Sequence, residues 1–169
     1  MNGAVYRYLA EDHRRLERLL DDATRDSSQI DTSAYLDFRG GLLRHISMEE
    51  KILLPAARAA LGGKPLPLAA ALRLDHGALA ALLVLTPTPI IIEAIRTILA
   101  AHNPKEEAPS GIYSQCESLA GFNSDKILLR LQEAPAVAMA DYVDSPLAIK
   151  SARSAIVRAG YDSGMLNGL

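Results

Sequence analysis

The chain has 169 residues, 49% of them hydrophobic and 22% charged, which is enough for one hydrophobic core with a small appendage. Its formal net charge of -2, with acidic and basic residues intermixed, argues against nucleic acid or an anionic membrane as a partner. The start turns polar too early for a signal peptide, and no apolar stretch is long enough to span a membrane. The single cysteine, Cys116, excludes an intramolecular disulfide and a cysteine-based zinc cluster. We therefore expect a cytoplasmic protein.

The first half of the chain predicts two helices. Ala, Leu, Arg and Glu fill long stretches and β-branched alternation is missing, which is typical of an all-α protein. The first helix is expected from about Val5 to Ala23. Either Asp31 or Thr32 caps the second helix, which ends at the Gly-Gly-Lys-Pro break of residues 62–65.

Two further helices follow, at about residues 68–85 and from Pro89 onward, with Thr88 as the cap of the latter. Short connections predict an up-down-up-down four-helix bundle over residues 1–121. Residues 122–169 are expected to form a short C-terminal helical appendage packed on the bundle. One of its helices begins at Ser124 as a cap, and residues 161–169 are expected to be loosely held.

All four histidines lie on apolar stripes, one on each predicted helix. A single histidine on such a stripe is usually a hydrogen-bonded core residue, but this does not account well for four. In chain order they are His13, His45, His76 and His102. We therefore expect the four imidazoles to point into the core.

Glutamate follows two of these histidines at a spacing of four residues, which places Glu49 and Glu106 on the same stripes. An ionised carboxylate in a bundle core is costly unless a positive charge meets it. A metal ion both neutralises the carboxylates and accepts the imidazole lone pairs. Two such pairs on facing helices predict a two-metal site.

An internal echo supports this interpretation. The segments EDHRRLERLL and LDHGALAALL share Asp-His and the leucines that follow, and RHISMEE and AHNPKEE share His and Glu-Glu. The sequence thus predicts two similar helical hairpins, each with one lone histidine and one His-x-x-x-Glu pair. Asp12 and Asp75 either orient the imidazoles as hydrogen-bond acceptors or are exposed polar neighbours.

The order His, His-x-x-x-Glu, His, His-x-x-x-Glu resembles the hemerythrin-like, or HHE cation-binding, domain family over roughly residues 5–121. The resemblance implies a left-handed four-helix bundle holding two iron ions, bridged by two carboxylates and an oxo or hydroxo group. Zinc or manganese can also occupy such ligands. Carried over residue by residue, the metal ligands are His13, His45, Glu49, His76, His102 and Glu106.

The chain departs from oxygen-carrying hemerythrins in two places. Its third helix supplies only one histidine, which favours oxidation chemistry, peroxide or nitric oxide handling, or iron sensing over reversible oxygen carriage. Pro104 and the residues after Glu106 predict a kink or register shift, so Glu107 or Glu117 is an alternative carboxylate. Tyr113 is either a hydrogen-bond donor near the metal or, by default, an ordinary core tyrosine.

The function expected from these residues is non-haem di-iron binding, with O2, NO, peroxide or iron bound or sensed at the two-metal centre. A small diatomic molecule or peroxide is the expected partner, and a homodimer is compatible with the sequence. Two alternatives stay open: a di-iron oxidoreductase of the peroxidase or oxidase kind, and a metal-free helical interaction protein.

Overall fold

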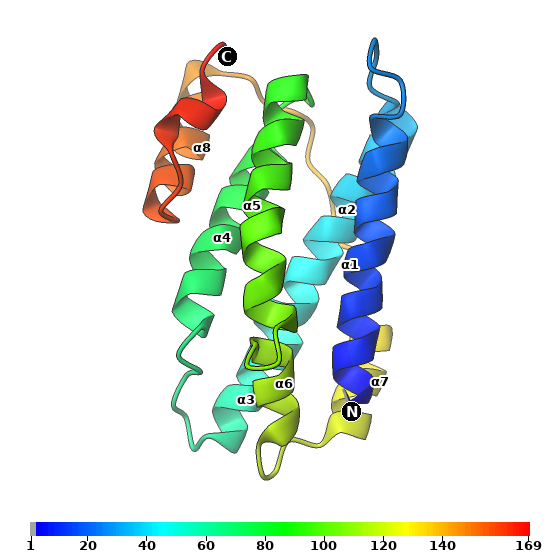
Figure 1. The fold of residues 1–169 in the computed structure, drawn as a ribbon, viewed down its shortest axis with the longest axis vertical. Helices are drawn as coiled ribbons and strands as arrows, with labels where there is room; N and C mark the ends of the chain where they lie inside the picture. Colours follow the sequence, from blue (N-terminus) through cyan, green and yellow to red (C-terminus); the bar gives the residue numbers. More distant parts are fainter. Residues whose placement is uncertain (1–2) are drawn as a thin grey trace. The chain divides into compact units, whose positions relative to one another are not determined.

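The structure, a computed structural model, describes residues 3–169, whose regular elements are all helical (Figure 1). Those residues contain no β-strand, which confirms the all-α prediction. The elements are α1 (Ala4–Ala23), α2 (Thr32–Met48), the π-helical turn η1 (Glu49–Leu53), α3 (Leu54–Ala60), α4 (Ala69–Leu82), α5 (Pro89–Glu107), α6 (Ile112–Ser118), α7 (Ser124–Gln132), α8 (Pro146–Arg158) and the 3-10 turn η2 (Ser163–Leu166). No helix in the described range is long and apolar enough to cross a membrane.

Contacts divide the chain into two units, each made of two segments. Unit 1 comprises the chain up to Ala69 together with Asn103–Ala138, and unit 2 comprises Ala70–His102 and Met139–Leu169. The division falls inside α5, between His102 and Asn103. The predicted appendage thus contributes α7 to unit 1 and α8 to unit 2, and a domain boundary at residue 121 stays a prediction.

Helices α1 and α2 form the frame of unit 1 and lie side by side (Figure 1). Helix α1 buries one apolar stripe that includes Leu9, Leu16 and Leu20. Asp31 caps α2, because its carboxylate accepts from the backbone N–H groups of Ser33 and Ala34. Of the two predicted caps, the structure therefore selects Asp31.

The first turn of α1 is capped from a distant part of the chain. Glu117 Oε1 accepts a hydrogen bond from the backbone N–H of Val5 at 2.8 Å. Gly3 makes room for that carboxylate, because a Cβ at this position would collide with the Glu117 side chain. Glu117 thus satisfies an N–H that the helix itself leaves unpaired.

The second predicted helix is interrupted by the π-helical turn η1, which begins at Glu49. Pro55 lies two residues after the end of η1 and has no N–H to donate to the carbonyl of Lys51. A wider turn accommodates this missing hydrogen bond, and such turns are frequent at functional sites. Pro55 was the signal in the sequence for this break.

Helices α4 and α5 carry the histidines of unit 2. Thr88 caps α5 as predicted, since its Oγ1 accepts from the N–H of Ile91 at 3.2 Å. The helix continues through Pro104 and ends at Glu107. In the second segment of unit 2, Asp144 accepts from both the N–H and the hydroxyl of Thr86, at 2.8 and 2.6 Å.

Two predictions about the last third of the chain were wrong. Asn123, not Ser124, caps α7, because its side chain accepts from the N–H of Lys126. Residues 161–169 are not loosely held either: they contain η2 and the fully buried Leu166, whose carbonyl accepts from Arg153 at 2.6 Å. One buried side chain and one charged donor fix the end of unit 2.

Candidate metal centre

Unit 1 brings four of the six predicted ligands together; we call them the first ligand set. They are His13, His45, Glu49 and Glu106. Each offers one ligand atom, and these atoms all lie within 4.8 Å of one another. All four side chains are buried. The set joins three helical segments, since α1, the end of α2 with η1, and the end of α5 contribute to it.

The spacing of these atoms fits one coordination sphere. His45 Nε2 lies 3.4 Å from Glu49 Oε1, and His13 Nε2 lies 3.3 Å from Glu106 Oε2. Metal–ligand bonds of about 2.1 Å place neighbouring ligand atoms roughly 3.0–3.4 Å apart. Two imidazoles and two carboxylates also suit zinc, iron or manganese. The residues present therefore fit a metal ion.

Carboxylates orient both imidazoles of the set through the ring nitrogen on the far side. His45 donates from Nδ1 to Asp12 Oδ2 at 2.9 Å, and His13 donates from Nδ1 to Glu107 Oε1 at 2.7 Å. This arrangement leaves both Nε2 atoms directed at the carboxylates of the set. It is the usual second layer of support around metal-binding histidines.

The hydroxyl of Tyr113 lies among the ligand atoms of the set. It donates to Glu49 Oε1 at 2.6 Å and lies 3.2 Å from Glu106 Oε2. It also lies 3.2 Å from His13 Nε2 and 3.3 Å from His45 Nε2. Of the two expectations for Tyr113, the hydrogen-bond donor at the site is confirmed.

A tight turn after α5 returns the chain so that Tyr113 can reach the set. The N–H of Gly111 donates to the carbonyl of Ala108 at 2.7 Å. A Cβ at Gly111 would collide with the backbone carbonyl of Glu106, so the close approach requires glycine. The turn between α5 and α6 therefore places Tyr113 with its hydroxyl at the first ligand set.

Burial and neighbouring charges shift the pKa values of side chains in and around the first ligand set. Burial alone would lower the pKa of His13, but the carboxylates of Glu106 and Glu107 raise it to about 10. Burial would raise the pKa of Asp12, but hydrogen bonds from His45 and Arg15 lower it to about 2. Burial, with Glu106 and Glu49, raises the pKa of Tyr113 well above its usual value. A metal must therefore displace protons to bind.

Unit 2 holds the other two predicted ligands, which we call the second histidine pair: His76 on α4 and His102 on α5. Their ring centroids lie 4.9 Å apart, and both side chains are buried. His102 donates from Nδ1 to Asp75 Oδ2 at 3.1 Å. Asp75 Oδ1 accepts a second hydrogen bond from the Tyr161 hydroxyl, also at 3.1 Å.

Of the three candidate carboxylates, Glu106 belongs to the first ligand set, whereas Glu107 and Glu117 make other contacts. Glu106 faces His13 Nε2, whereas Glu107 binds the opposite ring nitrogen and Glu117 caps α1. Cys116 is buried, and burial, with Glu49 and Glu117, raises the pKa of its thiol to about 12. The cysteine is therefore a core thiol.

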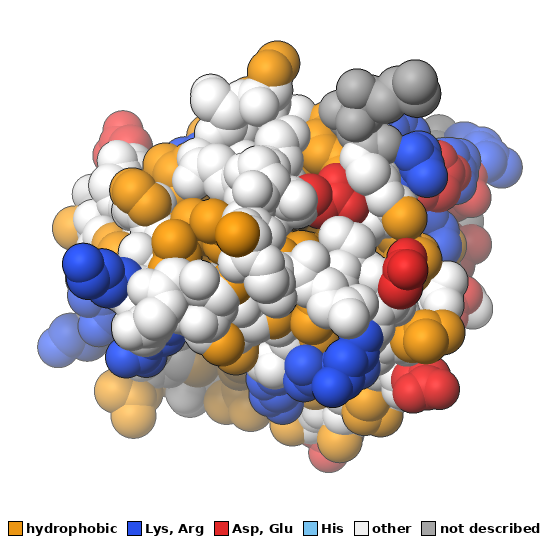
Figure 2. All heavy atoms as spheres, turned by 90° about the horizontal axis from the view of Figure 1, so that it is seen from below, with side chains coloured by type: hydrophobic (Ala, Val, Ile, Leu, Met, Phe, Trp, Pro, Cys, Tyr) orange, Lys and Arg blue, Asp and Glu red, His pale blue; other side chains and the backbone are white. Residues whose placement is uncertain are grey.

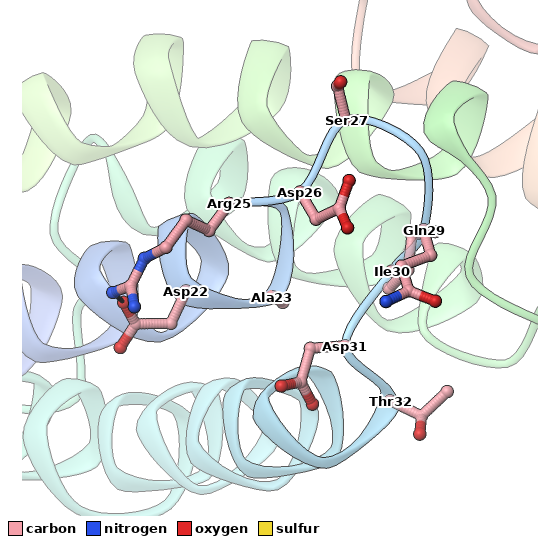
Figure 3. A pocket seen from close by; sticks show the side chains of 9 residues that line it. All are labelled: Asp22, Ala23, Arg25, Asp26, Ser27, Gln29, Ile30, Asp31 and Thr32. Atoms are coloured by element: carbon pink, nitrogen blue, oxygen red, sulfur yellow. Dashed lines mark hydrogen bonds and ion pairs between the residues drawn. The ribbon is translucent and has the colours of Figure 1, made fainter.

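The surface near the loop between α1 and α2 has a hollow that holds none of the six predicted ligands (Figure 3). Its acidic side chains serve the local backbone: Asp26 accepts from the N–H of Ser28, and Asp31 caps α2. The face drawn in Figure 2 displays hydrophobic, basic and acidic side chains but no pale-blue histidine. The six predicted ligands are buried and line neither of these surfaces.

Two supporting residues were missed by the sequence analysis. Glu107 was considered only as a replacement ligand, although it orients His13. Tyr161 was not considered at all, because it lies 86 residues from Asp75 and no motif links the two. Of the two expectations for Asp12 and Asp75, the structure supports the first: each accepts a hydrogen bond from the histidine of the next long helix.

Comparisons with curated proteins and with solved structures gave no match. A family model, the hemerythrin HHE cation-binding domain, matches residues 4–109. The match covers more than half of the chain and includes all six predicted ligands. Its description, together with the buried His and Glu cluster of unit 1, indicates binding of a metal cation. The chain therefore belongs to the hemerythrin HHE cation-binding domain family.

Proposed function

We propose that the protein is a non-haem di-iron protein that binds or senses a small molecule such as O2, NO or peroxide. The metal ligands would be His13, His45, Glu49, His76, His102 and Glu106. Membership of the family would imply that these residues hold two metal ions, with Glu49 and Glu106 as the carboxylates shared by both.

The observation that carries the proposal is the geometry of the first ligand set. Four ligand atoms of two kinds lie within 4.8 Å of one another in a buried position. Burying two carboxylates is costly unless cations meet them, and a metal ion meets both. Hydrogen bonds from Nδ1 of both histidines to carboxylates hold the Nε2 atoms in place for it.

A bound pair of iron ions would supply Lewis acidity and electrons for binding small ligands. The chain supplies ligand geometry and a dry surrounding. Leu9 and Leu16 lie on either side of His13 on α1, and both are buried. Ile98, one turn before His102 on α5, is buried as well. Such apolar neighbours limit access to small molecules.

The test is the visible spectrum of iron-reconstituted protein before and after addition of azide or nitric oxide. The proposal predicts a new charge-transfer band with azide and a nitrosyl spectrum with NO. Iron-loaded protein that responds to neither would contradict small-molecule binding. Steady consumption of peroxide with many turnovers would instead identify an oxidoreductase, because a sensor binds and stops.

A further inference from the structure

Tyr113 has the surroundings of a fifth donor in the first ligand set. Its hydroxyl oxygen contacts a ligand atom of all four members, at 2.6 Å from Glu49 and 3.2–3.3 Å from the other three. A tyrosine that only fills a core needs one polar partner for its hydroxyl. Here the oxygen meets two imidazole nitrogens and two carboxylate oxygens at once.

These separations resemble the edges of a coordination polyhedron. Ligand atoms around a metal with bonds of about 2.1 Å lie roughly 3.0–3.4 Å apart. The contacts of Tyr113 Oη with His13, His45 and Glu106 all fall in that range. The contact with Glu49 is shorter, at 2.6 Å, because the phenol proton lies between the two oxygens in the metal-free protein.

The tyrosine ring is held in this position from several sides. Tyr113 is fully buried on α6. It lies two residues after Gly111, where a Cβ would collide with the backbone carbonyl of Glu106. The ring of Tyr6 packs edge-on against it, with ring centroids 5.9 Å apart and an interplanar angle of 88°. The Tyr6 hydroxyl in turn donates to the backbone carbonyl of Glu107 at 2.6 Å. The packing of Tyr6 and the turn at Gly111 therefore hold the Tyr113 hydroxyl at the first ligand set.

We propose that Tyr113 is itself a metal ligand, binding through its phenolate oxygen the ion held by His13 and His45. The inference rests on the proposed metal centre and adds a fifth donor to its first ligand set. Metal binding releases the phenol proton to solvent, as it does for other acidic ligands.

The consequence is a change in the reactivity expected of this ion. An anionic oxygen donor favours the ferric over the ferrous state, because it stabilises the higher charge. It also fills a position that would otherwise be open to an exogenous ligand. Small molecules would then bind at the ion served by the second histidine pair, or only after Tyr113 has left.

The experiment compares full-length wild type, Tyr113→Phe and Tyr35→Phe after anaerobic ferrous loading and oxidation in air. Tyr35 is the matched control because it is fully buried in α2, ten residues before His45 and therefore roughly 15 Å away along the helix. Three quantities are measured: iron per chain, the visible spectrum, and the resonance Raman spectrum excited in the visible band. Circular dichroism checks that each variant folds.

We expect wild type and Tyr35→Phe to show a phenolate-to-iron charge-transfer band with tyrosinate Raman modes. Tyr113→Phe should lose both while still binding iron. Iron-loaded wild type without these modes, or Tyr113→Phe that keeps them, would overturn the inference and leave the metal centre standing. If no variant, wild type included, binds iron, the proposed function and this inference fail together. If Tyr113→Phe does not fold, tyrosinate modes in iron-loaded wild type and in Tyr35→Phe support the inference, because the Tyr113 hydroxyl contacts all four members of the set. The absence of these modes from wild type overturns it.

Discussion

The two helical hairpins that carry the histidines use the same carboxylate arrangement. In unit 1, Asp12 on α1 accepts from Nδ1 of His45 on α2 at 2.9 Å. In unit 2, Asp75 on α4 accepts from Nδ1 of His102 on α5 at 3.1 Å. Each aspartate directly precedes the lone histidine of its own helix. One Asp-His dipeptide therefore supplies both a proposed ligand and the support for a ligand on the next helix.

The hairpins differ in what holds the aspartate. The second oxygen of Asp12 binds Arg15, one turn away on α1, whose side chain is 42% exposed. The second oxygen of Asp75 binds Tyr161, from the C-terminal segment of unit 2. Asp75 is also the more buried, with 1% exposure against 9% for Asp12. Support in unit 1 is thus local and partly solvated, whereas in unit 2 it depends on a distant segment.

The largest effect is expected from removing one histidine of each hairpin. His45→Ala and His102→Ala should each lower the bound iron by about one ion per chain, if each removes a ligand of a different ion in the proposed two-metal centre. Thr97→Ala, an exposed change on α5, is the control. Wild-type iron content in either histidine variant, measured by mass spectrometry, would contradict the ligand assignment.

The next largest effect is expected on the stability of the metal-free protein, which should depend on pH because His13 is protonated. Its pKa in the folded state, about 10, lies above the ordinary value of 6.5 because Glu106 and Glu107 outweigh burial. A raised pKa means that the folded state holds the proton more tightly, so this contribution to stability is complete below pH 6.5. It is lost as the pH rises from 6.5 through about 10.

Urea unfolding of chelated protein across this pH window measures the loss. We expect the free energy of unfolding of wild type to fall toward alkaline pH more steeply than that of His13→Gln. Because other groups also titrate, the difference between the two proteins is the quantity that counts. Parallel pH profiles would show that His13 is not protonated in the metal-free fold.

Removing the supporting carboxylates should weaken metal binding without abolishing it. Asp12→Asn and Asp75→Asn are each expected to lower metal affinity by about 10–100-fold. The larger loss is expected for Asp75→Asn, because Asp75 is almost completely buried, whereas water can partly compensate at Asp12 beside the 42% exposed Arg15. Competition titrations with a chelator give both affinities. A larger loss in Asp12→Asn would reverse the comparison of the two hairpins.

The smallest effects on metal affinity are expected from replacing Tyr161 and Arg15, the residues that hold the two aspartates. Tyr161→Phe removes one hydrogen bond to Asp75, worth about 1 kcal/mol, or roughly fivefold in affinity if all of it reaches the metal. Arg15→Ala removes a half-exposed ion pair, for which water compensates, and should change affinity less. The same titrations compare the two variants. Equal effects would mean that the C-terminal segment gives His102 no special support.

Much of the helical structure could be predicted from sequence because its signals are local. Apolar spacing located α1, and the side chains of Asp31 and Thr88 capped helices where the sequence indicated. The π-helical turn at Glu49 was not predicted, although Pro55 signalled a lost hydrogen bond. Asn123 was overlooked as a cap because Ser124, the next residue, is an equally good capping residue type.

The supporting residues of the site were harder to predict because they act across the chain. The positions of His13 and His45 follow from helix periodicity, and their meeting in unit 1 was expected from the stripes. No periodicity brings Tyr113 back to the first ligand set; a turn fixed by Gly111 does so. Tyr161 likewise reaches Asp75 only through the tertiary arrangement of unit 2.

The most direct test of the central claim is the metal content of the full chain. Protein reconstituted anaerobically with ferrous iron, freed of unbound metal and analysed by mass spectrometry should contain about two irons per chain, as expected for a carboxylate-bridged pair. A value near zero, with no change in thermal stability on adding a chelator, would contradict the metal centre and with it the function proposed for this chain.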